Sequence, residues 1–131
     1  MNVRTLLCTL LLSSILALHS FADKPVHAIF LLHEVEYETS RTVPEFARAE
    51  LEEKLGWKCT FLIGDRPHQL PGTEIVEDAD VLFISVRRQI LPWEQLDPII
   101  KHCKAGKPVV GIRTASHAWI LQKRPPKNGV H

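Results

Sequence analysis

Four short apolar runs along the chain predict the strands of a sheet. They span residues 26–32, 57–63, 80–86 and 109–112. Each run is too short for a helix and is rich in β-branched or aromatic residues, as strands are. The last run is expected to be a buried parallel strand that leads into a sharp turn and a further helix.

Two longer segments carry a helical pattern. In residues 42–55, Thr42 is expected to cap the helix, Pro44 to lie in its first turn, and Gly56 to end it. In residues 92–105, apolar side chains recur at spacings of three and four, namely Trp93, Leu96, Ile99, Ile100 and Cys103.

The alternation of strands and helices predicts an α/β fold, a flavodoxin-like doubly wound parallel sheet of about four strands in three layers. In such a sheet the first and third strands are neighbours, and the fourth lies beside the third. We assign residues 23–122 to this domain. Residues 123–131 are basic and Pro-rich, and they are expected to form a disordered tail.

The start of the chain differs from the rest. Arg4 precedes an almost wholly apolar stretch, residues 6–18, and the small residues Ser20 and Ala22 follow. This pattern predicts a secretory signal peptide, residues 1–22, cleaved after Ala22. The apolar stretch is shorter than the roughly 20 residues of a membrane-spanning helix, so an uncleaved anchor is disfavoured. We therefore expect a secreted or periplasmic protein, with no membrane partner after cleavage.

Charge and cysteine content exclude several classes of function. The chain has 16 Lys and Arg residues against 15 Asp and Glu residues, and loss of Arg4 with the signal makes the balance neutral. A neutral balance argues against nucleic acid or an anionic membrane as the main partner. Cys59 and Cys103 remain after cleavage, too few for a disulfide scaffold, and buried unpaired thiols are favoured over a bridge.

Polar residues follow three of the predicted strands. The carboxyl ends of neighbouring parallel strands meet at one edge of a sheet, so these residues are expected to form one site. Arginine forks there suit carboxylate, phosphate or sugar hydroxyl groups. We predict a ligand site formed by His33, Glu34 and Tyr37 of the first loop, Arg87 and Arg88 of the second, and Arg113, Thr114 and His117 of the third. The same loops also carry Glu36, Gln89 and Ser116.

The arginines of this site have structural interpretations too. Arg113 directly follows a strand and needs a partner, which is either a ligand or a salt bridge to Glu34 or Glu36. Arg87 and Arg88 are either ligand contacts or solvated loop charges.

The acid, base and metal chemistry of the site is limited. A general base at His117 with Ser116 as its nucleophile is disfavoured, because adjacent residues usually point in different directions. His33 beside Glu34 is a weak metal signal compared with the spaced ligand sets of zinc sites, so we predict neither a metal nor a cofactor.

Three segments resemble the ThuA-like family, the trehalose-utilisation proteins of the class I glutamine amidotransferase-like superfamily. They are the first strand with HE after it, VLFISVRR, and GKPVVGIRTASHA, and the resemblance covers residues 26–119. In the amidotransferases the last segment is a nucleophile elbow. Here Gly111 and Ile112 match, but Arg113 stands at the cysteine position and Ala115 at that of the second glycine. Arginine stays protonated and presents only donors, so glutamine amidotransferase activity is not expected.

The resemblance implies a carbohydrate-related ligand, a small polyhydroxylated or anionic molecule, with Tyr37 or Trp119 against a sugar face. Binding without catalysis is the first hypothesis, and the alternative is an enzyme of sugar metabolism with Glu34 or His117 as acid or base. Family members are generally much longer. A truncated fragment that is non-functional or partner-dependent and a genuine short member are therefore both open, and in either case an uncovered sheet edge invites an oligomer.

Overall fold

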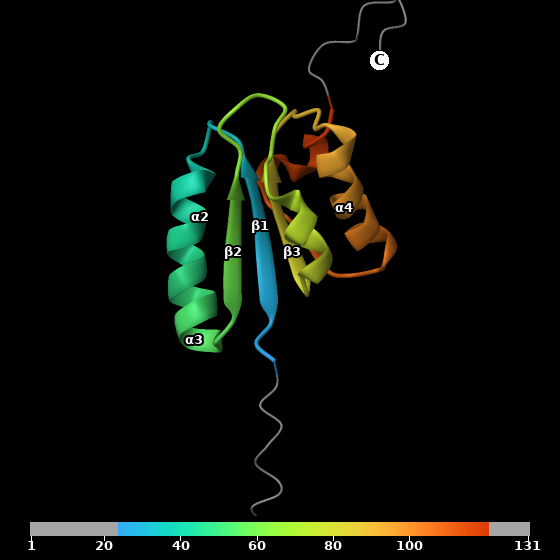
Figure 1. Cartoon of the computed structure of the whole chain (residues 1–131). Coiled ribbons are helices and arrows are strands. Elements are labelled where there is room, and N and C mark those ends of the chain that lie inside the picture. The colour runs from blue at the N-terminus through green and yellow to red at the C-terminus, as the bar shows by residue number, and fades with distance from the viewer. Residues whose placement is uncertain (1–23, 121–131) are drawn as a thin grey trace, which may run out of the picture.

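The structure is a computed structural model that describes residues 24–120 of the 131-residue chain. Within these residues, four parallel strands form one sheet with helical segments on both faces, an α/β fold of the flavodoxin-like type (Figure 1). The predicted fold class is confirmed. The expected signal peptide, residues 1–22, and the expected tail, residues 123–131, lie outside the described residues.

The four strands have the expected order. They are β1 (His27–His33), β2 (Lys58–Ile63), β3 (Val81–Val86) and β4 (Val109–Gly111), and they lie in the sheet as β2-β1-β3-β4. Each boundary is within one residue of its prediction. The carboxyl ends of β1 and β3 are neighbours as a result, with His33 paired to Val86.

β1 is the centre of the core. All of its residues are buried, because it pairs with β2 on one side and β3 on the other and is covered on both faces. On one face the Phe30 ring lies between Phe61 and Phe83, at centroid distances of 5.1 and 4.4 Å. On the other face Ile29 and Leu31 belong to a second buried cluster. Two apolar faces require two helical layers, which the alternation of elements supplies.

One helical segment covers the face that holds the phenylalanines. It consists of α2 (Thr39–Ala47), the π-helical η2 (Arg48–Glu52) and α3 (Glu53–Leu55). It ends at Gly56, whose φ is 67°, as predicted. It begins at Thr39 instead of Thr42, so that Pro44 lies inside α2 and not in its first turn. The earlier start has a physical cause, because the Glu34 carboxylate accepts a hydrogen bond from the Thr39 N–H.

Two elements cover the opposite face. The 3₁₀ helix η3 (Thr73–Asp78) and α4 (Trp93–Lys104) pack there, and Figure 1 shows α4 across the sheet from α2. The helix predicted over residues 92–105 is confirmed to within one residue at each end. Lys107 fixes the end of η3, since its Nζ donates to the carbonyls of Glu77 at 2.7 Å and Ala79 at 3.0 Å. Among residues 24–120, no helix has the length and apolar character needed to span a membrane.

β4 departs from the expectation of a buried strand. It pairs only with β3, and Val109 and Val110 are 42% and 40% exposed. An apolar run predicts a strand but does not say whether that strand is central or at the edge. After β4 the chain enters a 3₁₀ helix, η4 (Arg113–His117), where a further helix was expected after a turn.

The two described cysteines are unpaired, as favoured, but they differ in burial. Cys59 is half-buried, whereas Cys103 is exposed on α4, so the expectation of a buried thiol is wrong for Cys103. Burial raises the pKa of the Cys59 thiol to about 11, and the Glu52 carboxylate acts in the same direction.

This difference predicts selective alkylation. At pH 8 the Cys59 thiolate is about 100-fold rarer in the folded chain than in the unfolded one, because its pKa rises from 9.0 to about 11. Timed iodoacetamide labelling with peptide mass spectrometry should modify Cys103 quickly and Cys59 only after denaturation. The Cys59 thiol ionises at a lower pH in the unfolded chain than in the folded one. Its ionisation therefore also lowers the free energy of unfolding as the pH rises from 9 toward 11. Equal labelling of both thiols in the folded protein would contradict this assignment.

A second prediction concerns Gly64, which follows β2. A Cβ at this position would overlap the His33 ring. We expect Gly64→Ala to lower the free energy of unfolding by about 1–3 kcal/mol, measured by urea denaturation. In the double variant with His33→Ala, the ring is gone, so the Gly64→Ala effect should nearly vanish. Additive losses in this double-mutant cycle would show that another contact is responsible.

Candidate functional site

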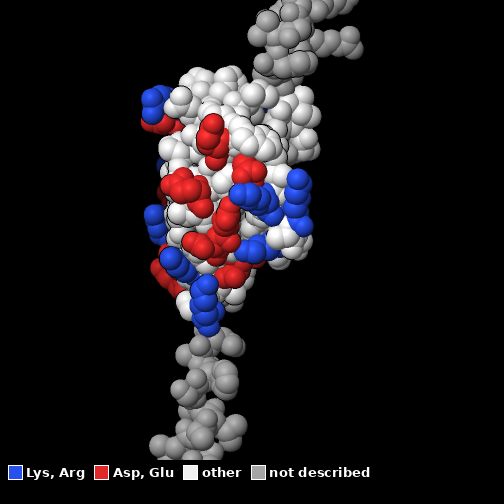
Figure 2. Space-filling model, turned by 45° about the vertical axis from the view of Figure 1, so that its right-hand side comes forward, with Lys and Arg blue, Asp and Glu red and all other residues white. Residues whose placement is uncertain are grey.

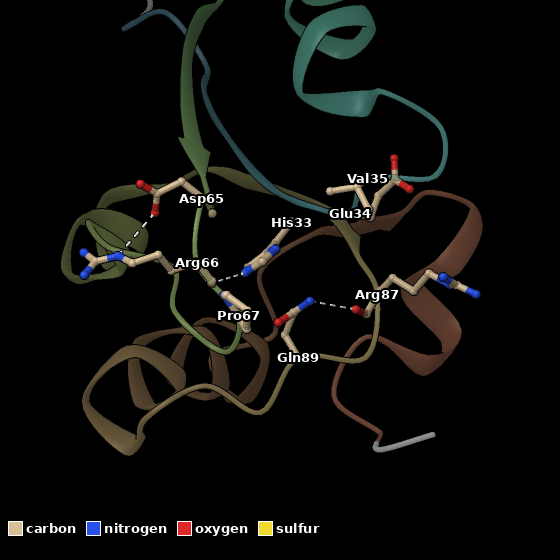
Figure 3. Close-up of a pocket in the computed structure, with 9 residues that line it drawn as sticks. His33, Glu34, Val35, Asp65, Arg66, Pro67, Arg87 and Gln89 are labelled. Carbon is tan, nitrogen blue, oxygen red and sulfur yellow. Dashed lines mark hydrogen bonds and ion pairs between the residues drawn. The ribbon is translucent and has the colours of Figure 1, made fainter. Parts of the chain in front are cut away.

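An open cavity of about 340 Å³ lies at the carboxyl edge of the sheet. Loops that follow β1, β2 and β3 form its walls (Figure 3). The lining residues are His33, Glu34, Val35, Gly64, Asp65, Arg66, Pro67, Arg87 and Gln89. The cavity therefore lies where the strand order of an open α/β sheet reverses, which is the usual ligand position of such sheets.

His33 connects the first two of these loops. Its buried ring packs on Gly64, which has no side chain to obstruct it, and its Nε2 lies 2.9 Å from the Arg66 carbonyl oxygen. A carbonyl only accepts, so Nε2 carries the proton. The Nδ1 atom is buried and has no hydrogen-bond partner within the described structure. His33 thus positions the loop after β2, and Figure 3 shows its ring pointing toward that loop.

Glu34 is a buried carboxylate that organises its own loop. Its Oε2 accepts hydrogen bonds from the N–H groups of Glu36 at 3.0 Å and Tyr37 at 3.1 Å, and its Oε1 accepts one from Thr39 at 3.2 Å. Glu34 is only 6% exposed, and both oxygens of its carboxylate accept these bonds. Its role in the structure is therefore to shape the loop between β1 and α2.

The loop after β3 is joined to both of its neighbours. Arg87 Nη1 is 3.0 Å from Glu36 Oε2 in the first loop. Gln89 Oε1 accepts the His68 N–H at 2.8 Å, and the His68 Nδ1 accepts the Ile90 N–H at 3.0 Å. Side-chain contacts thus cross-link the walls of the cavity.

The corner after β4 lies beside this cavity and does not line it. Arg113 has a left-handed backbone with φ 48°, and its guanidinium lies 3.9 Å from the centre of the Tyr37 ring. The alternative of a salt bridge to Glu34 or Glu36 is not realised. A Cβ at Gly111 would lie 3.1 Å from the Ala115 Cβ, so small residues are needed to form this tight corner.

The remaining predicted residues hold the corner against β3. The Thr114 hydroxyl donates to the Val86 carbonyl at 3.1 Å, and the Arg88 N–H donates to the His117 carbonyl at 3.2 Å. Ser116 Oγ is 3.2 Å from His117 Nδ1, so these adjacent side chains meet, contrary to expectation. Among the residues described, no carboxylate hydrogen-bonds to the His117 ring, as the third member of a catalytic triad would.

The structure divides the predicted site in two. His33, Glu34 and Arg87 line the cavity, whereas Tyr37, Arg88, Arg113, Thr114 and His117 belong to the adjacent corner. Sequence reasoning missed the loop after β2, which supplies Gly64, Asp65, Arg66 and Pro67. The signal was available, because the predicted strand order places β2 beside β1 and hence this loop beside His33.

Neither a metal-binding cluster nor a known relative assigns a role to this cavity. Over residues 24–120, no three His, Cys, Asp or Glu side chains are grouped so that they could hold a metal ion. Comparison of the chain with family models, curated proteins and solved structures finds no match. The fold and the cavity define the class, a flavodoxin-like α/β protein with an open site at its carboxyl edge.

The hydrogen bonds of Glu34 predict a stability effect. Glu34→Gln places an NH₂ group against at least one backbone N–H, so we expect the free energy of unfolding to fall by about 1–3 kcal/mol. Glu36→Gln is the matched control, because it breaks only a partly exposed ion pair and should cost less than about 1 kcal/mol. Urea denaturation of both variants measures the difference. Equal losses would mean that the loop does not depend on the Glu34 carboxylate.

Proposed function

We propose that the protein binds a small molecule in the cavity at the carboxyl edge of β2, β1 and β3. The observation that carries this proposal is the cavity, about 340 Å³, with cross-linked walls and with polar side chains such as Arg87 and Gln89 in its lining. This volume falls in the range of small-molecule sites, roughly 300–1,000 Å³.

Backbone strain at the same edge supports a binding role. Four non-glycine residues in the described part of the chain have positive φ, and one follows each strand: Glu38, His68, Arg88 and Arg113. The positive-φ glycines, Gly56, Gly72 and Gly106, lie outside these four turns. A left-handed non-glycine residue costs about 1 kcal/mol, and glycine would remove that cost. Strain retained together with polar side chains is typical of functional sites.

The ligand that we propose is small and polyhydroxylated or anionic, and related to carbohydrate. The ThuA-like resemblance implies this class, and the residues that carry the resemblance, including His33, Glu34 and Arg113, lie at this edge. Export to the periplasm or the exterior, which residues 1–22 predict, is part of the proposal. So is association through the edge of β4, where Val109 and Val110 are exposed.

Binding without catalysis is favoured over the enzymatic alternative. The Glu34 carboxylate is buried and accepts three backbone hydrogen bonds, so it is poorly placed to exchange protons with a ligand. His117 contacts Ser116 and, within the described residues, no carboxylate orients its ring. Neither of the two acid–base candidates is therefore set up for that role.

The cavity proposal predicts that Arg87 contributes to affinity. We expect at least one of trehalose, maltose, gluconate and galacturonate to bind, and Arg87→Ala to weaken that binding about tenfold, which is 1.4 kcal/mol. Calorimetric titration gives the dissociation constant, and the amide NMR spectrum locates the site.

Arg41→Ala is the matched control, because Arg41 of α2 forms a similar ion pair with Glu38, just before that helix, and does not line this cavity. The Arg41→Ala protein should bind the same sugar with the affinity of the unchanged protein. Binding that Arg87→Ala leaves unaltered, or that shifts only amides away from the cavity, would count against this site.

A further inference from the structure

Arg113 carries a positive charge that no carboxylate in the described part of the chain neutralises. Glu36 forms its ion pair with Arg87, and the Glu34 carboxylate is used by three backbone N–H groups. In residues 24–120 no ion pair includes Arg113. The only described contact of its guanidinium with a charged or aromatic group is with the ring of Tyr37.

The Tyr37 ring orients this guanidinium and leaves its hydrogen-bond donors free. The cation–π contact places the guanidinium carbon 3.9 Å from the ring centre, and an aromatic ring at this position accepts no proton from the planar N–H fork in the way that a carboxylate would. The N–H donors of arginine lie in the plane of the guanidinium, and Arg113 is exposed. A rigid planar fork of this kind matches the two oxygens of a carboxylate or phosphate.

The Arg113–Tyr37 pair adjoins the cavity. Tyr37 directly follows Glu36, which is bonded to the cavity residue Arg87, so the pair lies next to the Arg87 wall. Arginines are concentrated at this edge: Arg66, Arg87, Arg88 and Arg113 follow β2, β3 and β4, whereas no described lysine does. Figure 2 shows charged side chains of both signs over the lower and middle part of the face toward the viewer, and one basic side chain beside an acidic one at its upper left.

We infer that the ligand carries an oxyanion, a carboxylate or a phosphate, and that this group pairs with the Arg113 guanidinium held by Tyr37. The inference rests on the proposed function and narrows it, because a neutral sugar offers no charge for Arg113. The cavity contacts the hydroxyl-bearing part of the ligand, and Arg113 binds its anionic end. The strained backbone of Arg113 is retained because glycine at this position would lack the guanidinium.

The test compares charged and neutral forms of one sugar. Galacturonate, galactose 6-phosphate and galactose are titrated into the protein, and binding is followed by the ring signals of Tyr37, the single tyrosine of the chain. We expect at least one anionic form to bind about tenfold or more tightly than galactose, with a preference that falls as salt is added. Comparison of the two anions distinguishes a carboxylate ligand from a phosphate ligand.

Arg113→Gly is the decisive variant, because glycine adopts the left-handed backbone without strain and should raise the melting temperature. It should abolish the preference for the anion, so that the anionic sugar and galactose bind this variant with affinities within about twofold of one another. Tyr37→Phe keeps the ring and should retain the preference, while Tyr37→Leu should reduce it. Arg48→Ala is the control, since Arg48 makes the other cation–π contact, with Phe61, away from the site.

The outcomes separate this inference from the proposed function. A preference that disappears in Arg113→Gly supports it. Equal binding of galactose and both anions overturns the inference that the ligand carries an oxyanion, and a preference that survives Arg113→Gly overturns its pairing with Arg113. Either outcome leaves the cavity proposal standing. Absence of binding by all three sugars and by the disaccharides removes both.

Discussion

The complete burial of β1 is the constraint on which the rest of the structure depends. Its seven residues are all buried only if a strand pairs on each side and a helical layer covers each face. The Phe30 ring, stacked on Phe83 and tilted against Phe61, shows how closely these neighbours must fit. Because β1 is held so firmly, the loop that leaves its carboxyl end starts from a fixed position.

That loop converts a stable core into a defined site. The Glu34 carboxylate at the end of β1 accepts three N–H groups, and this fixes where the next residues point. Glu36 then meets Arg87 on one side of the loop, and Tyr37 meets Arg113 on the other. One buried carboxylate thereby arranges both halves of the edge, the cavity and the corner, without contributing its own charge to a ligand.

The same edge combines rigidity with strain. His33, His68 and Gln89 connect neighbouring loops through side-chain hydrogen bonds, while the chain accepts positive φ at polar residues. At the amino ends of β2 and β4, the residues with positive φ are glycines, Gly56 and Gly106, which adopt this backbone conformation without strain. The two ends of the sheet thus differ in which residues adopt a left-handed backbone: glycine at the amino end and polar residues at the carboxyl end.

The sequence by itself determined the strands, the helix over residues 92–105 and the order of the sheet, because these follow from local apolar patterns and the rules of parallel connections. It also predicted polar residues in the loops after β1, β3 and β4, and the structure brings these loops to one edge of the sheet. Only the tertiary structure decided which partners those loops would have. Local patterns do not encode distances between segments far apart in the chain. Those distances decided that Glu34 bonds to backbone N–H groups, that Arg113 lies on Tyr37, and that β4 is exposed.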